Sequence, residues 1–153
     1  MKASTHPPDW KEVKAYRNCF VCGADNKDGL QVKFYSDGKV ARAEFVPTER
    51  FSGYKNIFHG GVMAALLDEV MIKTVIANDR VAVTTRMSLS YKRPAKVGEK
   101  ILFRGEIVES KKKIVRTKGE ARNDEGELLA EATADFFIVE GKLKEKLSES
   151  LER

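Results

Sequence analysis

Residues 59–69 read His-Gly-Gly-Val-Met-Ala-Ala-Leu-Leu-Asp-Glu, so two glycines stand directly before an apolar run that contains two carboxylates. From position 61 to position 77 the residues favour a helix and leave no broad polar side, a pattern typical of a buried helix. Charged residues interrupt the run well before the roughly 20 apolar residues that a membrane span needs. We therefore expect a core helix wrapped by a sheet.

Asp68 lies in the middle of this expected helix, where an unpaired carboxylate is costly and its pKa tends to rise. A structural Asp, paired with an arginine or a hydroxyl, is one alternative. However, Gly61, Ala64, Ala65 and Asp68 follow the spacing i, i+3, i+4, i+7, so small side chains share a face with the acid and leave room for a ligand. At the helix start, Gly60 and Gly61 offer unpaired backbone N–H groups to an anion or oxyanion.

The distance between these two features predicts an oligomer. Gly61 and Asp68 are separated by roughly 10 Å along a straight helix, too far for one carbonyl group to touch both. If both act on one substrate atom, the simplest solution takes them from different copies of the chain at a two-fold interface. We expect a dimer with composite sites.

Composition bounds the class of protein. The chain has 153 residues, 33% of them charged and 42% hydrophobic, which is ordinary for one soluble globular domain. The net charge of +5 favours anionic partners such as phosphorylated ligands or nucleic acid. The sequence has no aromatic-basic motif for nucleic acid, no transmembrane segment and no secretory signal, so we expect a cytoplasmic protein that binds neither nucleic acid nor membrane.

Cys19 and Cys22 form a single Cys-x-x-Cys in a chain with only two histidines. A four-ligand zinc site would need two more donors, and a redox pair usually has a strand-to-helix setting, which is absent here. We expect no metal. Residues 18–30, dense in Gly, Asn and Asp, are interpreted as an ordered loop that plugs the core, with Phe20 and both cysteines buried.

Alternating patterns predict strands on both sides of the helix, at residues 30–35, 40–46, 81–93, 101–109, 114–123 and 128–139. Residues 1–17 are expected to form an extension, either disordered or holding a short surface helix packed by Trp10 and Tyr16. Residues 141–153 are expected to be a charged tail after a domain at 18–140. Strands joined by hairpins around one helix indicate an α+β domain whose curled antiparallel sheet wraps the helix.

Three groups of residues, in this order, carry a resemblance to a known family: Cys19-Phe20-Val21-Cys22-Gly23 with Gly29-Leu30, then His59-Gly60-Gly61 with Leu66-Leu67-Asp68-Glu69, then Thr84 with Tyr91-Lys92-Arg93-Pro94 and Gly98. The chain resembles the hotdog-fold acyl-CoA thioesterases, in the branch of phenylacetyl-CoA-type and thioesterase-superfamily-member proteins. The resemblance implies a hotdog fold of five or six strands around the helix. It also implies a homodimer or dimer of dimers with interface sites, an acyl-CoA substrate and no cofactor.

The same resemblance implies roles for individual residues. The backbone N–H of Gly60, with Gly61 beside it, polarises the thioester carbonyl, and Asp68 acts as general base or nucleophile. Thr84 helps to place the water, whereas Thr85 points to the opposite face of its strand. A thioester needs only an oxyanion site and an activated water, so this chemistry is coherent without a metal.

Other positions around the turn receive supporting roles. His59 is expected to brace the turn rather than to act as a base, and Glu69, about 100° round the helix from Asp68, is a secondary catalytic candidate. Some family members carry an Asn six residues before the His, a position that is Gly53 here. Asn56 lies nearby, and whether it compensates is open.

Substrate contacts are assigned in the same way. Lys92, Arg93 and the turn that contains Lys111 and Lys112 are candidates for the phosphates of coenzyme A. The acyl pocket is expected to be lined by Phe58, Met63 and Tyr54, and contacts from Asn56 and Thr85 complete the predicted substrate-binding set.

Three alternatives stay open beside a thioesterase. The first is a non-catalytic acyl-CoA binding or regulatory protein on the same fold. The second is a hydratase or dehydratase of related fold, which usually relies on a catalytic His, and the only candidate is the glycine-flanked His59. Nucleic-acid binding through the basic charge is the third.

Overall fold

The structure, a computed structural model, describes residues 6–152. Its elements, in chain order, are β1 (Lys11–Glu12), β2 (Ala15–Tyr16), β3 (Tyr35–Ser36), β4 (Val40–Phe45), a 3₁₀ turn (Glu49–Phe51), α1 (Gly60–Ile76), β5 (Ala82–Tyr91), β6 (Ile101–Ser110), β7 (Ile114–Asn123), β8 (Leu128–Ile138), α2 (Gly141–Ser150) and β9 (Leu151–Glu152). The central helix and the five long strands agree with the sequence prediction to within two residues at most ends. The strand expected at residues 30–35 is wrong for all but its last residue, because β3 begins only at Tyr35.

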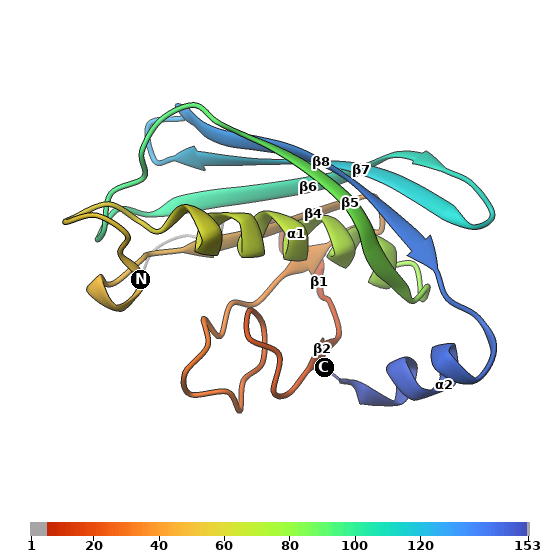
Figure 1. Cartoon of the computed structure of the whole chain (residues 1–153). Coiled ribbons are helices and arrows are strands. Elements are labelled where there is room, and N and C mark those ends of the chain that lie inside the picture. Colours follow the sequence, from red (N-terminus) through yellow and green to blue (C-terminus); the bar gives the residue numbers. More distant parts are fainter. Residues whose placement is uncertain (1–5, 153) are drawn as a thin grey trace.

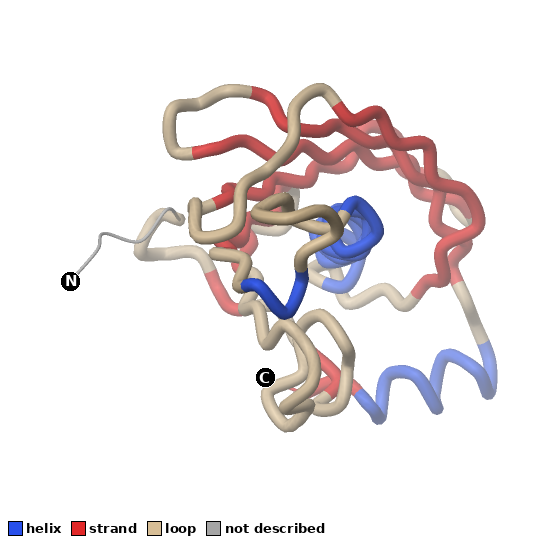
Figure 2. Tube along the Cα trace, turned by 60° about the vertical axis from the view of Figure 1, so that its left-hand side comes forward, coloured by secondary structure: helices blue, strands red, loops and turns tan. Residues whose placement is uncertain are grey.

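A single seven-stranded sheet forms the main layer, in the order β1-β3-β4-β6-β7-β8-β5, and its neighbouring strands are antiparallel. The sheet curls around α1, which runs along its concave side (Figures 1 and 2). This is the α+β architecture that the pattern of strands and one helix predicts, and it is the hotdog fold that the resemblance implies. The number of strands exceeds the expected five or six because the two-residue β1 extends the sheet at one edge.

The core lies between α1 and the concave face of the sheet. The helix buries the side chains of Met63, Leu66, Leu67, Val70, Met71, Lys73, Thr74 and Val75. Each fully buried leucine contributes about 1.5–3 kcal/mol relative to an exposed one. Two glycines let the helix approach the sheet closely: Gly105 on β6 lies directly opposite Gly119 on β7, and a Cβ at Gly105 would meet the Val70 carbonyl oxygen at 2.6 Å.

The opposite face of α1 is only partly covered. Asp68 and its neighbours on that face are of intermediate burial, and β5 beside them is the edge strand of the sheet, paired only with β8. The sequence predicts a helix that is covered on all faces. Within one chain, the sheet covers only the face that points toward it. No helix in residues 6–152 is both long and apolar enough to cross a membrane.

The terminal segments differ from expectation. In place of a helix or disorder near Trp10 and Tyr16, the structure has the short strands β1 and β2, and β2 pairs with β9. The helix prediction fails because β1 and β2 gain hydrogen-bond partners from β3 and β9, which a local pattern does not reveal. The charged tail forms α2, which carries β9 back to β2.

Candidate functional site

The start of α1 leaves one backbone amide free. His59 is the N-cap, and its Nδ1 accepts the N–H of Gly61 at 2.9 Å, while its carbonyl accepts those of Val62 and Met63 at 3.1 and 3.0 Å. Across the part of the chain that the structure describes, the N–H of Gly60 has no acceptor. His59 thus braces the turn, as expected, and the exposed Gly60 amide is the donor available to a ligand at the positive helix end.

Asp68 projects from the middle of α1 toward β5. Its Oδ1 accepts a hydrogen bond of 2.9 Å from the hydroxyl of Thr84, so the structure brings these two predicted residues together. Burial raises the pKa of the Asp68 carboxyl, and the Thr84 hydrogen bond partly opposes that rise. Asp68 has no ion pair among residues 6–152. A carboxyl held by a hydroxyl, without a neutralising cation, remains available to take a proton.

A pocket of about 300 Å³ opens beside the helix start. It is lined by Ile57, Phe58, Gly60, Met63, Tyr91, Lys92, Arg93, Pro94 and Ala95. Five predicted site residues therefore meet in one place, and the buried side chains of Phe58 and Met63 supply its apolar floor. An apolar floor with cations at its rim suits a ligand that has an apolar body and a charged end.

Tyr91 is a pocket residue that sequence reasoning did not assign to the site. Its hydroxyl donates to the carbonyl of Gly60 at 2.5 Å, and its ring lies against the position that a Cβ on Gly60 would occupy. Burial raises the pKa of its phenol. Its place directly before Lys92 at the end of a long strand was the available signal, because strand ends commonly supply site residues.

The two cations of the pocket are each paired within the chain. Lys92 lies 3.5 Å from Glu131, and Arg93 lies 2.8 Å from Glu127. All four side chains are at least a third exposed, so these pairs are weak and can reorganise around an anionic ligand.

Other predicted residues lie elsewhere in the chain. Lys111 and Lys112 belong to the β6–β7 turn, and Arg80, just beyond the C-terminal end of α1, donates to their carbonyl oxygens at 3.2 and 3.1 Å. They are thus far from the start of α1 in the same chain (Figure 1). Thr85 sits at an irregularity in the β5–β8 register and donates to the Asp135 carbonyl at 3.0 Å. Asn56 adopts a φ of 62° and its carbonyl accepts the amide of Val97.

Glu69 points away from Thr84, into a group of side chains that the sequence did not connect. Its Oε1 accepts the Cys22 thiol at 3.5 Å, its Oε2 lies 3.9 Å from the Cys19 sulfur, and Lys73 lies 3.8 Å away. Burial, followed by the nearby charge of Cys19, raises the pKa of Glu69 to about 7. The Cys22 thiol proton, shared with the Cys19 sulfur, lowers the pKa of Cys19 to about 5 and raises that of Cys22.

The loop that carries these cysteines is only partly as expected. It is ordered, and Cys22 is buried, but Cys19 is of intermediate burial and Phe20 is 46% exposed. The prediction that Phe20 is buried is wrong, and the same prediction is met only in part for Cys19. The backbone of the loop turns the two cysteines toward α1, so the ring between them is directed outward.

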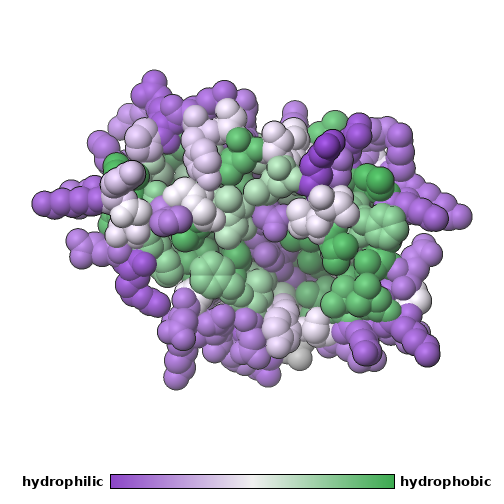
Figure 3. Space-filling view, in the orientation of Figure 1, coloured by the Kyte–Doolittle hydropathy of each residue, from purple (hydrophilic) through white to green (hydrophobic). Residues whose placement is uncertain are grey.

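An apolar surface covers the face of the molecule that carries α1 and β5. Figure 3 shows hydrophobic residues across the middle of this face and hydrophilic residues around its rim. Val83 and Tyr91, both on the edge strand β5, are 43% and 54% exposed. Apolar patches with a polar rim commonly mark interaction sites.

Comparisons with known proteins agree with this architecture. The family model described as "Thioesterase superfamily" matches residues 55–130, the segment from before α1 to β8. An uncharacterised protein of Schizosaccharomyces pombe is 33% identical over 113 residues, which cover 69% of this chain and 63% of that protein.

Solved structures share the fold. The crystal structure of a thioesterase superfamily protein matches with a TM-score of 0.73 and 26% identity, over 80% of this chain and 61% of that one. A hypothetical thioesterase protein from Streptococcus pneumoniae, solved with coenzyme A, matches with a TM-score of 0.64 and 22% identity, over 66% of this chain and 82% of that one. The chain thus spans less than two thirds of the yeast protein and of the first structure. From its helix, its curled sheet and these matches, the chain belongs to the thioesterase superfamily of hotdog-fold proteins.

Proposed function

We propose that this protein hydrolyses acyl-CoA thioesters at sites shared between two copies of the chain. The observation that carries the proposal is the Asp68 carboxyl, partly buried, free of any cation within residues 6–152 and held by the Thr84 hydroxyl at 2.9 Å. Its raised pKa brings the carboxylate closer to the pH at which a general base works well. Asp68 then activates a water or attacks the thioester carbon itself.

The free N–H of Gly60 supplies the second element. A carbonyl oxygen that gains negative charge during attack is stabilised by a backbone donor at the positive end of a helix. Gly60 and Asp68 stand eight residues apart, roughly 12 Å along the helix, so one helix cannot offer both to a single carbonyl group. Pairing the α1 faces of two chains across their apolar surface would place the Asp68 of one copy near the Gly60 of the other.

The substrate class is supported by the pocket at the helix start. Its apolar floor suits an acyl group, and Lys92 and Arg93 at its rim suit phosphates. The Streptococcus pneumoniae protein of the same fold was solved with coenzyme A. Lys111 and Lys112 would contribute to phosphate binding only from another chain of the assembly.

The first test measures hydrolysis of a panel of acyl-CoA thioesters, counted by released thiol after subtraction of the protein's own two cysteines. Asp68→Asn keeps the shape of the side chain but removes the base, and should lower kcat by about 10²- to 10⁴-fold. The exposed turn residue Asp124 offers the matched control Asp124→Asn, which should be neutral. If Asp68→Asn retains full turnover, the assignment of the base is wrong.

A non-catalytic acyl-CoA binding protein is the second candidate, since the ion-paired state of the pocket cations is compatible with binding alone. Calorimetry with a non-hydrolysable acyl-CoA thioether distinguishes the two. Binding without turnover of any thioester in the panel would favour this candidate.

The shared site is tested by mixing two inactive variants. Gly60→Pro deletes the proposed N–H donor, and Pro is well tolerated at the first helical position. The preceding His59 has φ −61° and ψ 127°, which the residue before a proline readily adopts. In a mixed dimer of Gly60→Pro and Asp68→Asn, one composite site is fully wild type, so about half the wild-type activity per dimer should return. No recovery in verified mixed dimers would show that each site belongs to one chain.

A further inference from the structure

The loop segment Cys19-Phe20-Val21-Cys22-Gly23, which we term the cysteine turn, is folded tightly back on itself. The amide of Val21 points at the Cys19 sulfur at 3.4 Å, and the amide of Gly23 donates to the Cys19 carbonyl at 2.9 Å. A Cβ on Gly23 would lie 2.4 Å from the Arg17 carbonyl oxygen and 2.5 Å from the Cys19 nitrogen, so only glycine fits there. Amides aimed at a sulfur stabilise the thiolate, which is the form that binds metal ions.

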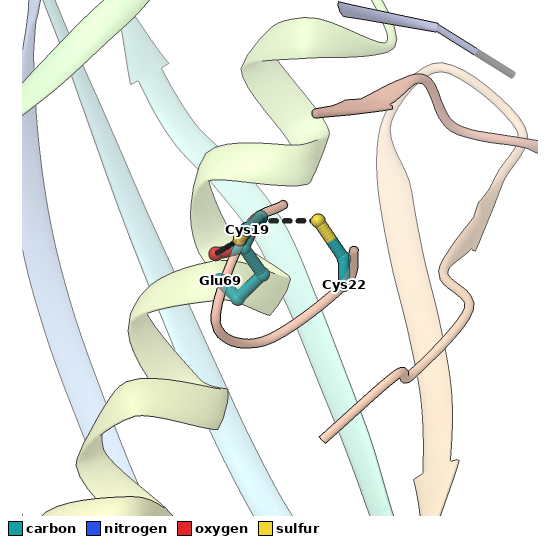
Figure 4. A group of neighbouring side chains, drawn as sticks. All are labelled: Cys19, Cys22 and Glu69. Atoms are coloured by element: carbon teal, nitrogen blue, oxygen red, sulfur yellow. Dashed lines mark hydrogen bonds between the residues drawn. The ribbon is translucent and has the colours of Figure 1, made fainter. Parts of the chain in front are cut away.

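Both sulfurs of the cysteine turn face the carboxylate of Glu69 on α1 (Figure 4). Cys22 Sγ lies 3.5 Å from Oε1 and Cys19 Sγ lies 3.9 Å from Oε2. One ligand atom from each of the three residues lies within 4.8 Å of the other two. Ligand atoms around one tetrahedral zinc ion, with bonds of about 2.0–2.3 Å, are separated by roughly 3.5–4 Å, so side-chain rotations would suffice to close the site.

The charge around the cluster also fits a divalent cation. Two thiolates, one carboxylate and Zn²⁺ together carry a net charge of −1. Lys73, only 1% exposed, lies 3.8 Å from Glu69 and is fixed by donation to the Lys14 carbonyl at 2.6 Å. Its positive charge would neutralise the site with zinc bound. That interaction would offset part of the cost of burying a lysine, which the ion pair with Glu69 alone does not fully offset.

We propose that Cys19, Cys22 and Glu69 bind one zinc ion, with the fourth position open to water or another small ligand. Thiolate ligands select zinc over magnesium or calcium, and three protein ligands leave an open position. The partial exposure of Cys19 gives an entry path. The ion would join the cysteine turn to α1 one residue from Asp68, and would supply the third donor that the Cys-x-x-Cys sequence alone lacks.

The test uses the full chain, reduced, stripped of metal by a chelator and kept anaerobic. Titration with Co²⁺ should give thiolate-to-cobalt charge-transfer bands and tetrahedral d–d bands that saturate at one ion per chain, and Zn²⁺ should displace the Co²⁺. Competition with a chromophoric chelator then measures zinc affinity. Zinc should also raise the melting temperature, since an ion that binds only the folded state stabilises it.

Variants assign the ligands. Cys22→Ser should abolish the charge-transfer bands. Glu69→Gln should lower the affinity for zinc by at least about tenfold, whereas the exposed control Glu125→Gln should bind zinc as tightly as the wild type does. Circular dichroism checks that each variant is folded. Failure of the reduced wild-type chain to bind Co²⁺ or Zn²⁺ would overturn the proposal without any variant. An unchanged zinc affinity in Glu69→Gln would also overturn it. The same holds if the isolated chain has a Cys19–Cys22 disulfide and takes up no metal after that disulfide is reduced.

Discussion

Replacing Gly105 by alanine should destabilise the fold through a collision with the helix backbone. The new Cβ would lie 2.6 Å from the Val70 carbonyl oxygen, 0.8 Å short of the 3.4 Å at which ordinary contact begins, and 3.2 Å from the Met71 amide nitrogen. A helix backbone cannot yield as a side chain does, so α1 must move away from the sheet along its central turns. Such overpacking costs about 2–3 kcal/mol of unfolding free energy, which for a domain of this size lowers Tm by about 4–12 °C.

Gly119 provides the matched control, because it faces Gly105 across the β6–β7 pair. A Cβ there would meet Met71 Cγ at 3.0 Å and Sδ at 3.3 Å, atoms of a flexible side chain that can adopt another rotamer. Gly119→Ala should therefore cost less than about 1 kcal/mol, since alanine also reduces the freedom of the unfolded chain.

Urea unfolding followed by circular dichroism measures both variants. The midpoint of Gly105→Ala should fall with an unchanged slope, because the unfolded surface is the same. Equal losses for the two variants, or a neutral Gly105→Ala, would refute the inference that the helix backbone touches the sheet at this position. If the activity of Gly105→Ala falls by more than its folded fraction does, the placement of α1 also sets the geometry of the site.

Three further outcomes follow from individual contacts. Thr84→Val should lower kcat by up to about tenfold and move the acidic limb of the pH–rate profile to higher pH, because the Thr84 hydrogen bond lowers the pKa of Asp68 and its removal lets that pKa rise. Thr84→Ser, which keeps the hydroxyl, should restore both the rate and the position of the limb. The Lys118 ammonium holds the pKa of Glu106 below its usual 4.5. The ionised carboxyl therefore stabilises the fold above pH 4.5, and this stabilisation disappears as the pH falls through the lowered pKa. Glu106→Gln should make the folding stability measured in acid depend less steeply on pH. Tyr91→Phe removes the hydrogen bond to the Gly60 carbonyl, so it should loosen the first turn of α1 and reduce kcat/KM by up to about tenfold. An unchanged kcat/KM would show that this hydrogen bond does not support the site.

The fold followed from short-range patterns, because the apolar run after Gly61 and the alternating strands each carry their own period. The site followed only where its parts were local. The His59 cap and the free Gly60 amide arise within a few residues, and Thr84 was assigned by resemblance. What the sequence could not give were contacts between distant segments. The cysteine turn meets Glu69 across roughly 50 positions of the chain, and no periodicity records that meeting.

Burial was the second limit. Lys73 interrupts an apolar helix, and the sequence alone suggests a solvent-exposed charge. The structure buries Lys73 almost completely, because its ammonium donates a hydrogen bond to the Lys14 carbonyl and forms an ion pair with Glu69. Phe20 reads as a core residue and is half exposed instead, because the turn that aims the neighbouring cysteines inward aims its ring outward. In both cases a tertiary partner outweighs the intrinsic preference of the residue.

The cap at the start of α1 fixes more than the first turn of the helix. Since Nδ1 of His59 accepts the Gly61 amide, the neutral imidazole must carry its hydrogen on Nε2. That tautomer has no lone pair left for a substrate proton, and a doubly protonated ring would forfeit the bond that starts the helix. Proton abstraction near the glycine pair is thereby left to a carboxylate, and a nitrogen-15 chemical shift for Nδ1 typical of an unprotonated ring nitrogen would display this constraint directly.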